Sequence, residues 1–140
     1  MAKLDAARGD LAITYDVNWL DLWSERFADP LSDAESLRVD RRGTLTEIGS
    51  RVTSLHEIEG QYMGLLKFSP AAWGWVTGLL DLLGPETRDK LDMTSLLKRL
   101  IADGRRIDTV PITARWFEVD NENDLKLYES WARERGGSLW

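Results

Sequence analysis

The sequence predicts an α/β domain with a mixed sheet, flanking helices and a β-hairpin insertion. Three observations support this fold class. Segments typical of strands alternate along the chain with segments typical of helices, which is the pattern of layered α/β domains. Two helical segments carry N-capping residues, at Ser69 and Asp92. The 140 residues, 43% of them hydrophobic, are enough for a core, so residues 1–140 are expected to form a single domain.

The first part of the chain begins with a strand and continues into a polar insertion. Residues 11–17 (LAITYDV) follow a Gly-Asp turn signal and predict a short strand. Apolar residues in 18–27 are spaced as in a helix or an irregular turn. After a loop at 29–35, residues 36–49 alternate on both sides of a turn, which predicts a β-hairpin. The insertion over 29–58 should therefore lie to one side of the main sheet.

The middle of the chain predicts a strand followed by a helix. Residues 60–69 (GQYMGLLKFS) are mostly apolar and predict a buried, central strand. Ser69-Pro70 is typical of an N-cap and a first helical position, and the helix should stop at Gly84-Pro85. This helix and the next one along the chain are expected to pack on the sheet.

The last part of the chain predicts two more helices and two more strands. A helix over 92–104 should be capped by Asp92 or Thr94, and strands are expected at 106–112 and 114–119. The final helix should begin near Asn121 and end at Gly136-Gly137. Its inward face should consist of Leu125, Tyr128 and Trp131.

Composition excludes several classes of function. The net charge of −6, with basic residues scattered, gives no electrostatic reason to expect a nucleic-acid partner. The absence of cysteine excludes disulfides and thiolate-bound zinc, and the single histidine, His56, excludes a multi-histidine metal centre. No apolar run is long enough to span a bilayer, and the N-terminus has no signal-peptide core, so we expect no membrane association and a cytoplasmic location.

Two carboxylates in RWFEVDNENDL (115–125) are the first candidates for chemistry. Glu118 and Asp120 stand two residues apart at the end of a predicted strand, so their side chains should point to the same face. Mg²⁺ prefers a few carboxylates together with phosphate oxygens and water. The spacing equally fits a simpler interpretation, in which Asp120 or Asn121 caps the final helix and Glu118 is solvated. Residue spacing leaves both interpretations open.

Three further features have a structural and a functional interpretation. Trp19 and Trp23 either pack in a core or form an aromatic wall for a cationic ligand, which Asp16 and Asp21 would also suit. Glycines at 60 and 64 mark either tight packing or the close approach of a ligand. The histidine in TSLHEIEG (53–60) is typical of a surface residue.

Several stretches in order resemble the second half of bacterial nucleotidyltransferases. They are YDVNWLDLWSERFADPLSDAE, GTLTEIG, EIEGQYMGLLKFSPAAW, LDMTSLL and RWFEVDNENDLKLYE, which together cover about residues 9–135. The chain is similar to the sugar-phosphate nucleotidyltransferase-like enzymes that include phosphocholine and phosphonate cytidylyltransferases. This resemblance implies the C-terminal half of a Rossmann-like fold. It also implies transfer of a nucleotidyl group, with CTP as the expected donor, to a phosphorylated or phosphonylated small molecule.

The resemblance also implies roles for particular residues. Asp120 matches the second metal-binding Asp of the family, with Glu118 beside it, so Mg²⁺ is the expected cofactor. Gly64 matches a glycine where a strand passes the acceptor substrate. Trp23 falls where choline-type members place an aromatic residue near the acceptor's amine. Asp92 falls near an acidic residue at the same end. Tyr62 belongs to the same expected substrate-binding set.

One departure from the family separates this sequence from a complete enzyme. The Gly-rich phosphate-binding loop with its Pro-Lys, and the first metal-binding Asp, are not found in this sequence, and Asp10 and Asp16 come too late to replace that Asp. Phosphoryl transfer depends on positioning and on neutralising charge, so no catalytic residue is assigned and enzyme activity of this chain is left open. We expect a half-site that is inactive alone, with a complementing N-terminal half or a homo-oligomer as partner. The alternative is a non-catalytic oligomerising or small-ligand-binding domain.

Overall fold

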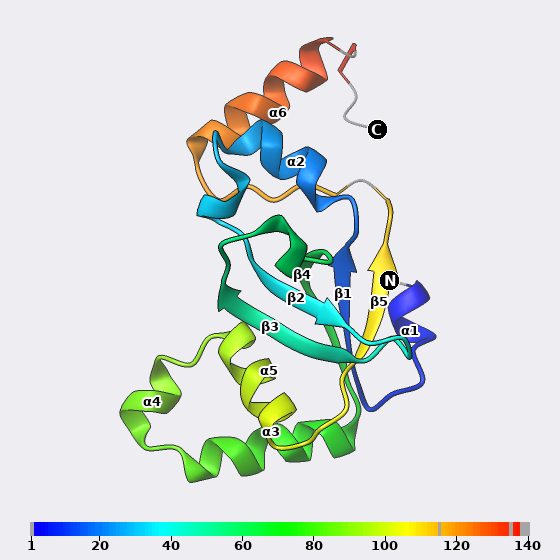
Figure 1. Cartoon of the computed structure of the whole chain (residues 1–140), viewed down its shortest axis with the longest axis vertical. Helices are drawn as coiled ribbons and strands as arrows, with labels where there is room; N and C mark the ends of the chain where they lie inside the picture. The colour runs from blue at the N-terminus through cyan, green and yellow to red at the C-terminus, as the bar shows by residue number, and fades with distance from the viewer. Residues whose placement is uncertain (1, 115, 135, 138–140) are drawn as a thin grey trace.

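The computed structural model, which describes residues 2–114, 116–134 and 136–137, contains a three-stranded mixed sheet. Its strands are β1 (Leu11–Asp16), β4 (Gln61–Phe68) and β5 (Asp108–Ile112), in the order β4-β1-β5. Strand β1 runs antiparallel to β4 and parallel to β5, so β1 and β5 end at the same edge (Figure 1). The expected α/β class with a mixed sheet is confirmed.

The expectation that 60–69 forms the central strand is wrong for the described residues. β1 has a neighbour on each side, whereas β4 pairs with β1 alone. Leu11 and Ile13 of β1 are fully buried, but β4 is only partly covered and Leu65 is 44% exposed. An apolar run marked a strand correctly, but it could not tell which strand has two partners.

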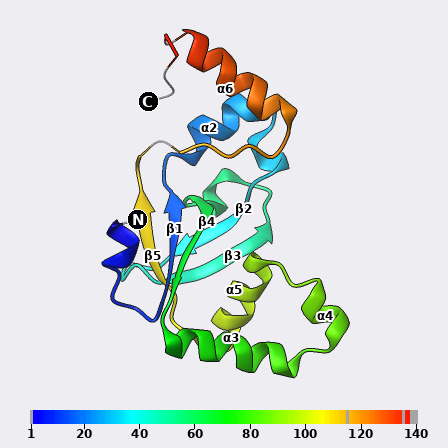
Figure 2. The same cartoon turned by 180° about the vertical axis from the view of Figure 1, so that it is seen from behind.

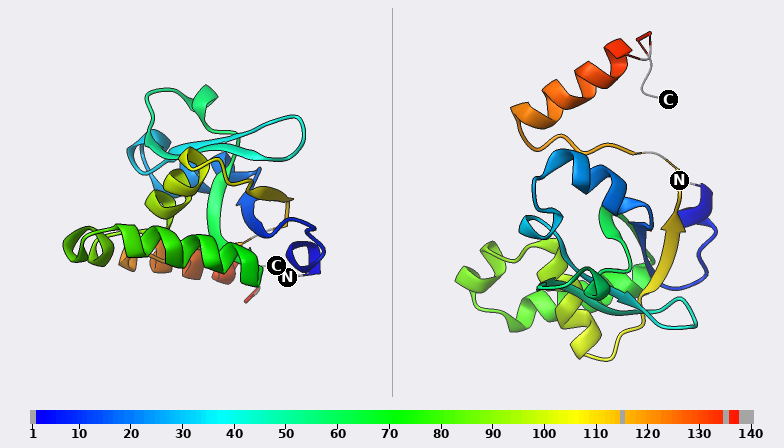
Figure 3. Two further views of the ribbon diagram at one scale, coloured as in Figure 1. Left: turned by 90° about the horizontal axis from the view of Figure 1, so that it is seen from below. Right: turned by 45° about the horizontal axis from the view of Figure 1, so that its top comes forward.

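The predicted hairpin forms a second, two-stranded sheet from β2 (Glu35–Val39) and β3 (Leu45–Arg51). The Asp40 carboxylate accepts hydrogen bonds from the backbone N–H of Arg42 and of Thr44, which closes the turn. Leu37 and Ile48 of this sheet are buried in the main core. The hairpin therefore lies to one side of the main sheet, as expected, and is flanked by the short helices η1 (Pro30–Ser32) and η2 (Leu55–Glu57). Figure 3 shows the two sheets from two further directions.

Helices α3 (Pro70–Leu82), α4 (Pro85–Asp89) and α5 (Met93–Ala102) lie together at one end of the molecule (Figures 1 and 2). Ser69 caps α3 by accepting from the N–H of Ala72 at 3.1 Å, and Asp92 caps α5 by accepting from the N–H of Ser95 at 2.7 Å. Both predicted caps are confirmed. The main core lies between the two sheets and helices α3 and α5. The short helix α1 (Ala2–Asp5) lies beside β1 and β4.

Helices α2 (Trp19–Arg26) and α6 (Glu122–Glu134) lie at the opposite end, beyond the carboxyl ends of β1 and β5 (Figure 1). A second core forms around the buried Trp19 and Trp23 of α2. Within the described residues, no helix is long and apolar enough to cross a membrane.

Two expectations for the C-terminal part are corrected. Residues 116–119 are not a strand, because Trp116 and Phe117 turn their rings onto α2 and α6 instead of joining a sheet. On α6, Tyr128 is buried as expected, but Leu125 is 49% exposed and Asp124 is buried instead. Asp124 can be buried because it is paired with a cation, as described below.

Candidate functional site

A pocket of about 420 Å³ opens where β1 and β5 end. In open α/β sheets, ligands bind beyond the carboxyl ends of parallel strands, because the loops that follow the strands converge there. Here the Asn18 side chain donates to the carbonyl of Thr113, which ties the start of α2 to the segment after β5. The pocket is lined by Asp16, Asn18, Asp21, Leu22, Glu25, Thr113, Ala114, Trp116, Phe117 and Trp131.

The last residue of β1, Asp16, is the most buried carboxylate of this pocket. It is 5% exposed, and it accepts from the backbone N–H of Asn18 at 2.8 Å and from the indole N–H of Trp116 at 3.1 Å. Burial raises the pKa of Asp16, and these two hydrogen bonds only partly oppose that rise. Asp16 therefore brings a poorly solvated carboxylate to the pocket and also fixes the orientation of the Trp116 ring.

Two more carboxylates reach the pocket from α2. Asp21 and Glu25 stand four residues apart on one helical face, an arrangement of like charges that disfavours the helix. No ion pair involves either of them, or Asp16, within the described residues. The pocket thus combines uncompensated negative charge with the aromatic walls of Phe117 and Trp131. Such a lining suits an organic cation and repels a phosphate.

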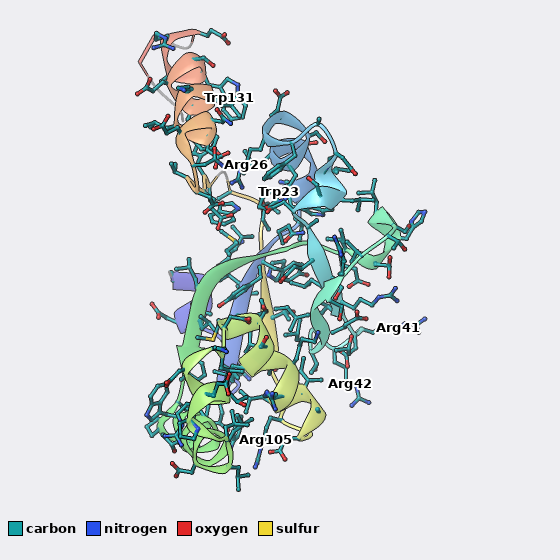
Figure 4. The ribbon with its side chains drawn as sticks, turned by 90° about the vertical axis from the view of Figure 1, so that its left-hand side faces the viewer. Trp23, Arg26, Arg41, Arg42, Arg105 and Trp131 are labelled. Atoms are coloured by element: carbon teal, nitrogen blue, oxygen red, sulfur yellow. The ribbon has the colours of Figure 1, made fainter. Side chains whose placement is uncertain are left out.

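Beside the pocket, an arginine whose side chain is fully buried joins α2 to the loop before α6. The Arg26 guanidinium donates from Nε and Nη2 to the two carboxylate oxygens of Asp124, at 2.9 Å each. It also donates from Nη2 to Asp120 at 2.7 Å and from Nη1 to Glu118 at 3.4 Å. Figure 4 shows Arg26 near the start of the helix that carries Trp131.

Aromatic rings complete the surroundings of this arginine. The guanidinium carbon lies 5.0 Å from the ring centroids of both Trp23 and Phe27, so cation–π attraction adds to the ion pairs. Burial alone would lower the pKa of Arg26, but its hydrogen bonds to Asp124 and Asp120 outweigh that effect and raise it. Arg26 is therefore a permanent cation inside the protein.

The carboxylates around Arg26 outnumber its single positive charge and differ from one another in burial. Three carboxylates face one guanidinium. Hydrogen bonding to Arg26 holds the pKa of Asp124 below its usual range. Burial, and then the neighbouring charge of Asp120, raises the pKa of Glu118 against the opposing effect of Arg26. Burial is also the main cause of the raised pKa of nearby Asp33. The cluster keeps a surplus of negative charge at its exposed side, where Asp120 lies.

The residue that caps α6 is Asn121. Its side-chain oxygen accepts from the backbone N–H of Asn123 at 2.8 Å and of Asp124 at 3.2 Å. Asp124 in turn accepts from the backbone N–H of Asp120 at 3.0 Å. The capping interpretation is thus correct for Asn121, and it leaves both Glu118 and Asp120 directed at Arg26.

These contacts test whether the site fits magnesium. No group of three or more His, Asp or Glu side chains among the described residues could hold a metal ion. Glu118 and Asp120 do converge on a common cation, but that cation is Arg26. The Asp120 side chain remains 56% exposed, so it can still offer oxygen to a solvated ion. One such carboxylate is a partial magnesium site, since Mg²⁺ commonly takes one or two carboxylates and completes its shell with phosphates and water.

The structure places the remaining expected substrate-binding residues away from the pocket lining. Trp23 is buried and packs edge-on against Trp19 at 6.1 Å, as in the core-packing interpretation. Asp92 caps α5, and hydrogen bonds from Ser95 lower its pKa. His56 is exposed, as expected. Substrate contacts by Trp23 and Asp92 stay predictions.

Strand β4 carries Gly64 and Tyr62, the other two residues expected to bind substrate. Gly64 has φ +72° at an irregularity in the β1–β4 register, and a Cβ there would meet nothing within 4 Å. The positive φ explains why residue 64 is a glycine, and the open space where a Cβ would lie leaves room for a ligand. The Tyr62 hydroxyl is buried without a hydrogen-bond partner among the described residues, and burial raises its pKa. By contrast, Gly60 is required by packing, because a Cβ there would overlap the Tyr15 ring.

Sequence reasoning missed Arg26 and Asp124. Arg26 stands 98 positions before Asp124, and no spacing rule connects a lone arginine to such a distant carboxylate. One usable signal was the convergence of Glu118 and Asp120, which indicated a shared cation. A second was the placement of an acidic residue on the otherwise inward face of the final helix.

Comparison with known proteins finds similarity to nucleotidyltransferases in sequence and in fold. A curated CTP:phosphoglutamine cytidylyltransferase from Campylobacter jejuni subsp. jejuni serotype O:2 is 37% identical over 131 residues, which cover 89% of this chain and 51% of that protein. The solved structure of a CMP:2-keto-3-deoxy-manno-octonic acid synthetase complexed with CTP matches with a TM-score of 0.57 at 15% identity. It covers 94% of this chain and 52% of that one. No protein-family model matches the chain.

These comparisons confirm the resemblance to cytidylyltransferase-like nucleotidyltransferases and the Rossmann-like fold. The chain spans about half the length of each of the two proteins.

Proposed function

We propose that this chain forms the acceptor side of a cytidylyltransferase, which transfers a cytidylyl group from CTP to a phosphorylated or phosphonylated small molecule with release of pyrophosphate. The observation that carries the proposal is the pocket at the carboxyl ends of β1 and β5, whose lining includes Trp116 and Phe117 of the segment that leads to Asp120. The donor and the phosphorylated kind of acceptor are supported by the name of the curated relative, which is 37% identical.

The pocket chemistry orients the acceptor. Asp16, Asp21 and Glu25 repel a phosphate, whereas the aromatic walls and the negative charge attract an ammonium group. The cationic end of the acceptor therefore enters the pocket, and its phosphate or phosphonate end faces outward. Phe117 lines the pocket and directly precedes Glu118, so the outward end lies near the Arg26 cluster. An acceptor of the choline, ethanolamine or aminoalkylphosphonate type fits better than a sugar phosphate, whose sugar end carries no positive charge.

Asp120 is the proposed magnesium ligand, with Glu118 as a more distant contributor. When bound, the ion neutralises phosphate charge and aligns the CTP phosphates with the acceptor. Arg26 holds one Asp120 oxygen at 2.7 Å, and Asp124 holds the Asp120 backbone, so both the side chain and the main chain of Asp120 are fixed. Gly64 and Tyr62 lie farther along the sheet and are kept as acceptor-side candidates.

We also propose that this chain needs a complementing N-terminal half for turnover, since the phosphate-binding loop and the first metal-binding Asp are not in this sequence. A second function is favoured by the pocket itself. Its lining comes entirely from this chain, so the chain could bind a cationic small molecule without catalysing any reaction. A cytoplasmic location stays a prediction.

Isothermal titration calorimetry tests the acceptor assignment. The titrants are phosphocholine, 2-aminoethylphosphonate and, as a comparison without an ammonium group, glucose 1-phosphate. The double variant Asp21→Asn/Glu25→Gln should weaken binding of the first two by about tenfold, because two favourable charge interactions are lost. The matched control Glu86→Gln/Asp89→Asn removes two acids from exposed helix α4 and should leave binding unchanged. Equal binding of all three titrants by wild type, or no effect of the double variant, would contradict the assignment.

A further inference from the structure

Helix α3 has the composition of a buried helix but is covered on one side only. From Pro70 to Leu80 it contains no charged residue, and a helix that is apolar all round is normally buried on all sides. Yet only Ala72 and Val76 are fully buried. Trp73 is 55% exposed and Leu82 is 88% exposed. This much uncovered apolar surface on one helix is typical of an interaction site.

The exposed side of α3 borders an open groove. The groove lies between α3 and α5 and has a volume of about 660 Å³. Two glycines one helical turn apart, Gly74 and Gly78, line it, and a Cβ on either would meet nothing within 4 Å. Trp75 forms another part of the wall, with the Arg105 guanidinium 5.1 Å from its ring centroid. The groove therefore has an apolar side on α3, is hollow over the two glycines and is edged by the charged residues Arg99, Asp103 and Arg105.

We propose that this groove is the interface through which two copies of the chain form a twofold-symmetric dimer. In such an interface the same patch occurs on both sides, so each patch must be complementary to itself. This patch meets that condition in shape, because the protruding Leu82 borders the hollow over Gly74 and Gly78. Leu82 of each copy fills the hollow of the other.

Charge supports a second copy over an unrelated partner. Arg99 of α5 lines the groove, Asp81 directly precedes the groove residue Leu82 near the end of α3, and both are exposed. Neither forms an ion pair with any residue that the structure describes. A twofold axis brings Asp81 of one copy to Arg99 of the other, and the reverse, which makes two ion pairs. A partner of a single charge sign would satisfy only one of the two residues.

The interface lies away from the acceptor pocket. Helices α3 and α5 are at one end of the molecule, and α2 and α6 are at the other (Figures 1 and 2). Figure 4 shows the same separation, with Arg105 at the groove end and Trp131 at the pocket end. Dimerisation through the groove therefore leaves both pockets of the dimer open, and it does not depend on the proposed function.

The experiment measures molar mass by sedimentation equilibrium and light scattering over a range of protein concentrations. The wild-type chain should approach twice the 16.0 kDa of one copy as concentration rises, with dissociation in about the micromolar range for an interface at the small end of the specific class. A mass of one copy throughout, up to several hundred micromolar, overturns the proposal.

Two variants of α3 locate the interface. Gly78→Glu fills the groove, where the monomer has open space. It should raise the dissociation constant of the dimer at least tenfold without loss of helical content. Thr77→Glu is the matched control, because it adds the same side chain at a neighbouring exposed position that does not line the groove. Unchanged dimerisation of Gly78→Glu, or equal weakening by both variants, places the interface elsewhere and overturns the proposal.

Charge reversal tests whether the partner is a second copy of the chain. This test is independent of the Gly78→Glu variant. Asp81→Arg and Arg99→Asp alone should each weaken dimerisation severalfold, because like charges then face each other. The double variant Asp81→Arg/Arg99→Asp restores both ion pairs and should recover most of the wild-type affinity. Failure of the double variant to recover affinity, with both single variants weakened, overturns the proposed pairing.

Discussion

Arg26 and Asp124 form a two-pronged ion pair, with both N–O distances at 2.9 Å, although 98 positions separate them in the sequence. The Arg26 side chain is completely buried and the Asp124 side chain is 3% exposed. This pair fixes helix α6 against helix α2 and holds the loop that carries Asp120. The stability of the pocket end of the molecule therefore depends on one guanidinium.

Replacing Arg26 should destabilise the protein strongly. Arg26→Met leaves Asp124 buried without its cation, which typically costs about 3–5 kcal/mol. Arg26→Lys should not restore the lost stability, because an ammonium group cannot reproduce the planar fork of the guanidinium or its stacking on Trp23. Urea unfolding measures the change. The control Lys90→Met breaks the exposed Lys90–Glu86 pair of 2.8 Å and should have no measurable effect. Equal midpoints for Arg26→Met and Lys90→Met would refute this role.

Stability should pass through a maximum at mildly acidic pH. The raised pKa values of Glu118 and Asp16 contribute stability that is present below their ordinary values of 4.5 and 3.8 and is lost as pH rises through the folded values. The lowered pKa of Asp124 contributes stability that is present above 3.8 and is lost as pH falls through its folded value. The melting temperature should therefore rise from pH 7 toward 4.5 and fall below 3.8.

Two variants separate these contributions to the pH profile. Asp16→Asn should reduce the gain as pH falls from 7 to 3.8, and Asp124→Asn should make the fall below pH 3.8 shallower. A wild-type melting temperature that increases steadily from pH 3 to pH 7 is inconsistent with the raised pKa values.

Millimolar Mg²⁺ should stabilise the wild-type chain slightly, and this gain should require Asp120. Binding to the folded state raises the melting temperature by mass action, and the gain is small because most ligands of the ion come from elsewhere. Asp120→Asn should abolish it. Asp103→Asn is a matched control, because Asp103 is also an exposed acid paired with an arginine. Its side chain is 59% exposed, and that of Asp120 is 56% exposed. Identical Mg²⁺ responses of all three proteins would remove Asp120 from the metal site.

The chain alone should release no pyrophosphate from CTP with phosphocholine or 2-aminoethylphosphonate. A separately expressed N-terminal half that supplies the phosphate-binding loop should restore turnover in a mixture. In that mixture, Asp120→Ala should cost several kcal/mol of transition-state stabilisation, as expected when a metal ligand is lost. Turnover by the pure 140-residue chain would show that the half-site interpretation is incorrect.

Two glycines, one just before β4 and one within it, should respond differently to substitution by alanine. At Gly60 a Cβ would overlap the Tyr15 ring and lie 2.7 Å from the carbonyl oxygen of Asp16, so Gly60→Ala must displace the end of β1. At Gly64 the only obstacle is the positive φ of +72°, which costs about 1–2 kcal/mol. Denaturant unfolding should therefore rank Gly60→Ala as the more damaging variant, and the reverse order would contradict the packing described here.

Local rules predicted most of the elements, because they depend on neighbouring residues. Ser69 and Asp92 begin helices as their capping chemistry requires, and the hairpin turns at Asp40. Sheet order could not be predicted in the same way, because pairing partners are distant in sequence. The apolar run of β4 therefore indicated a strand but not its place in the sheet.

The candidate site was predictable only in part for the same reason. The spacing of Glu118 and Asp120 indicated correctly that their side chains converge on a cation. It could not indicate that the cation is Arg26, which α2 delivers from more than ninety positions away. The strand expected over 114–119 is absent from its described residues, because Trp116 donates a hydrogen bond to Asp16 and Phe117 packs on Tyr128 instead of facing a neighbouring strand.

The parallel pairing of β1 with β5 also sets the order of assembly during synthesis. Ala12 pairs with Asp108, so the ribosome must deliver more than ninety further residues before the central strand finds its second neighbour. The β1–β4 and β2–β3 pairings are closer in sequence and can form earlier. The pocket at the carboxyl ends of β1 and β5, whose lining includes Thr113 and Trp131, consequently forms only after the β1–β4 and β2–β3 pairings can form. A nascent chain stalled before β5 carries its other strands but no pocket.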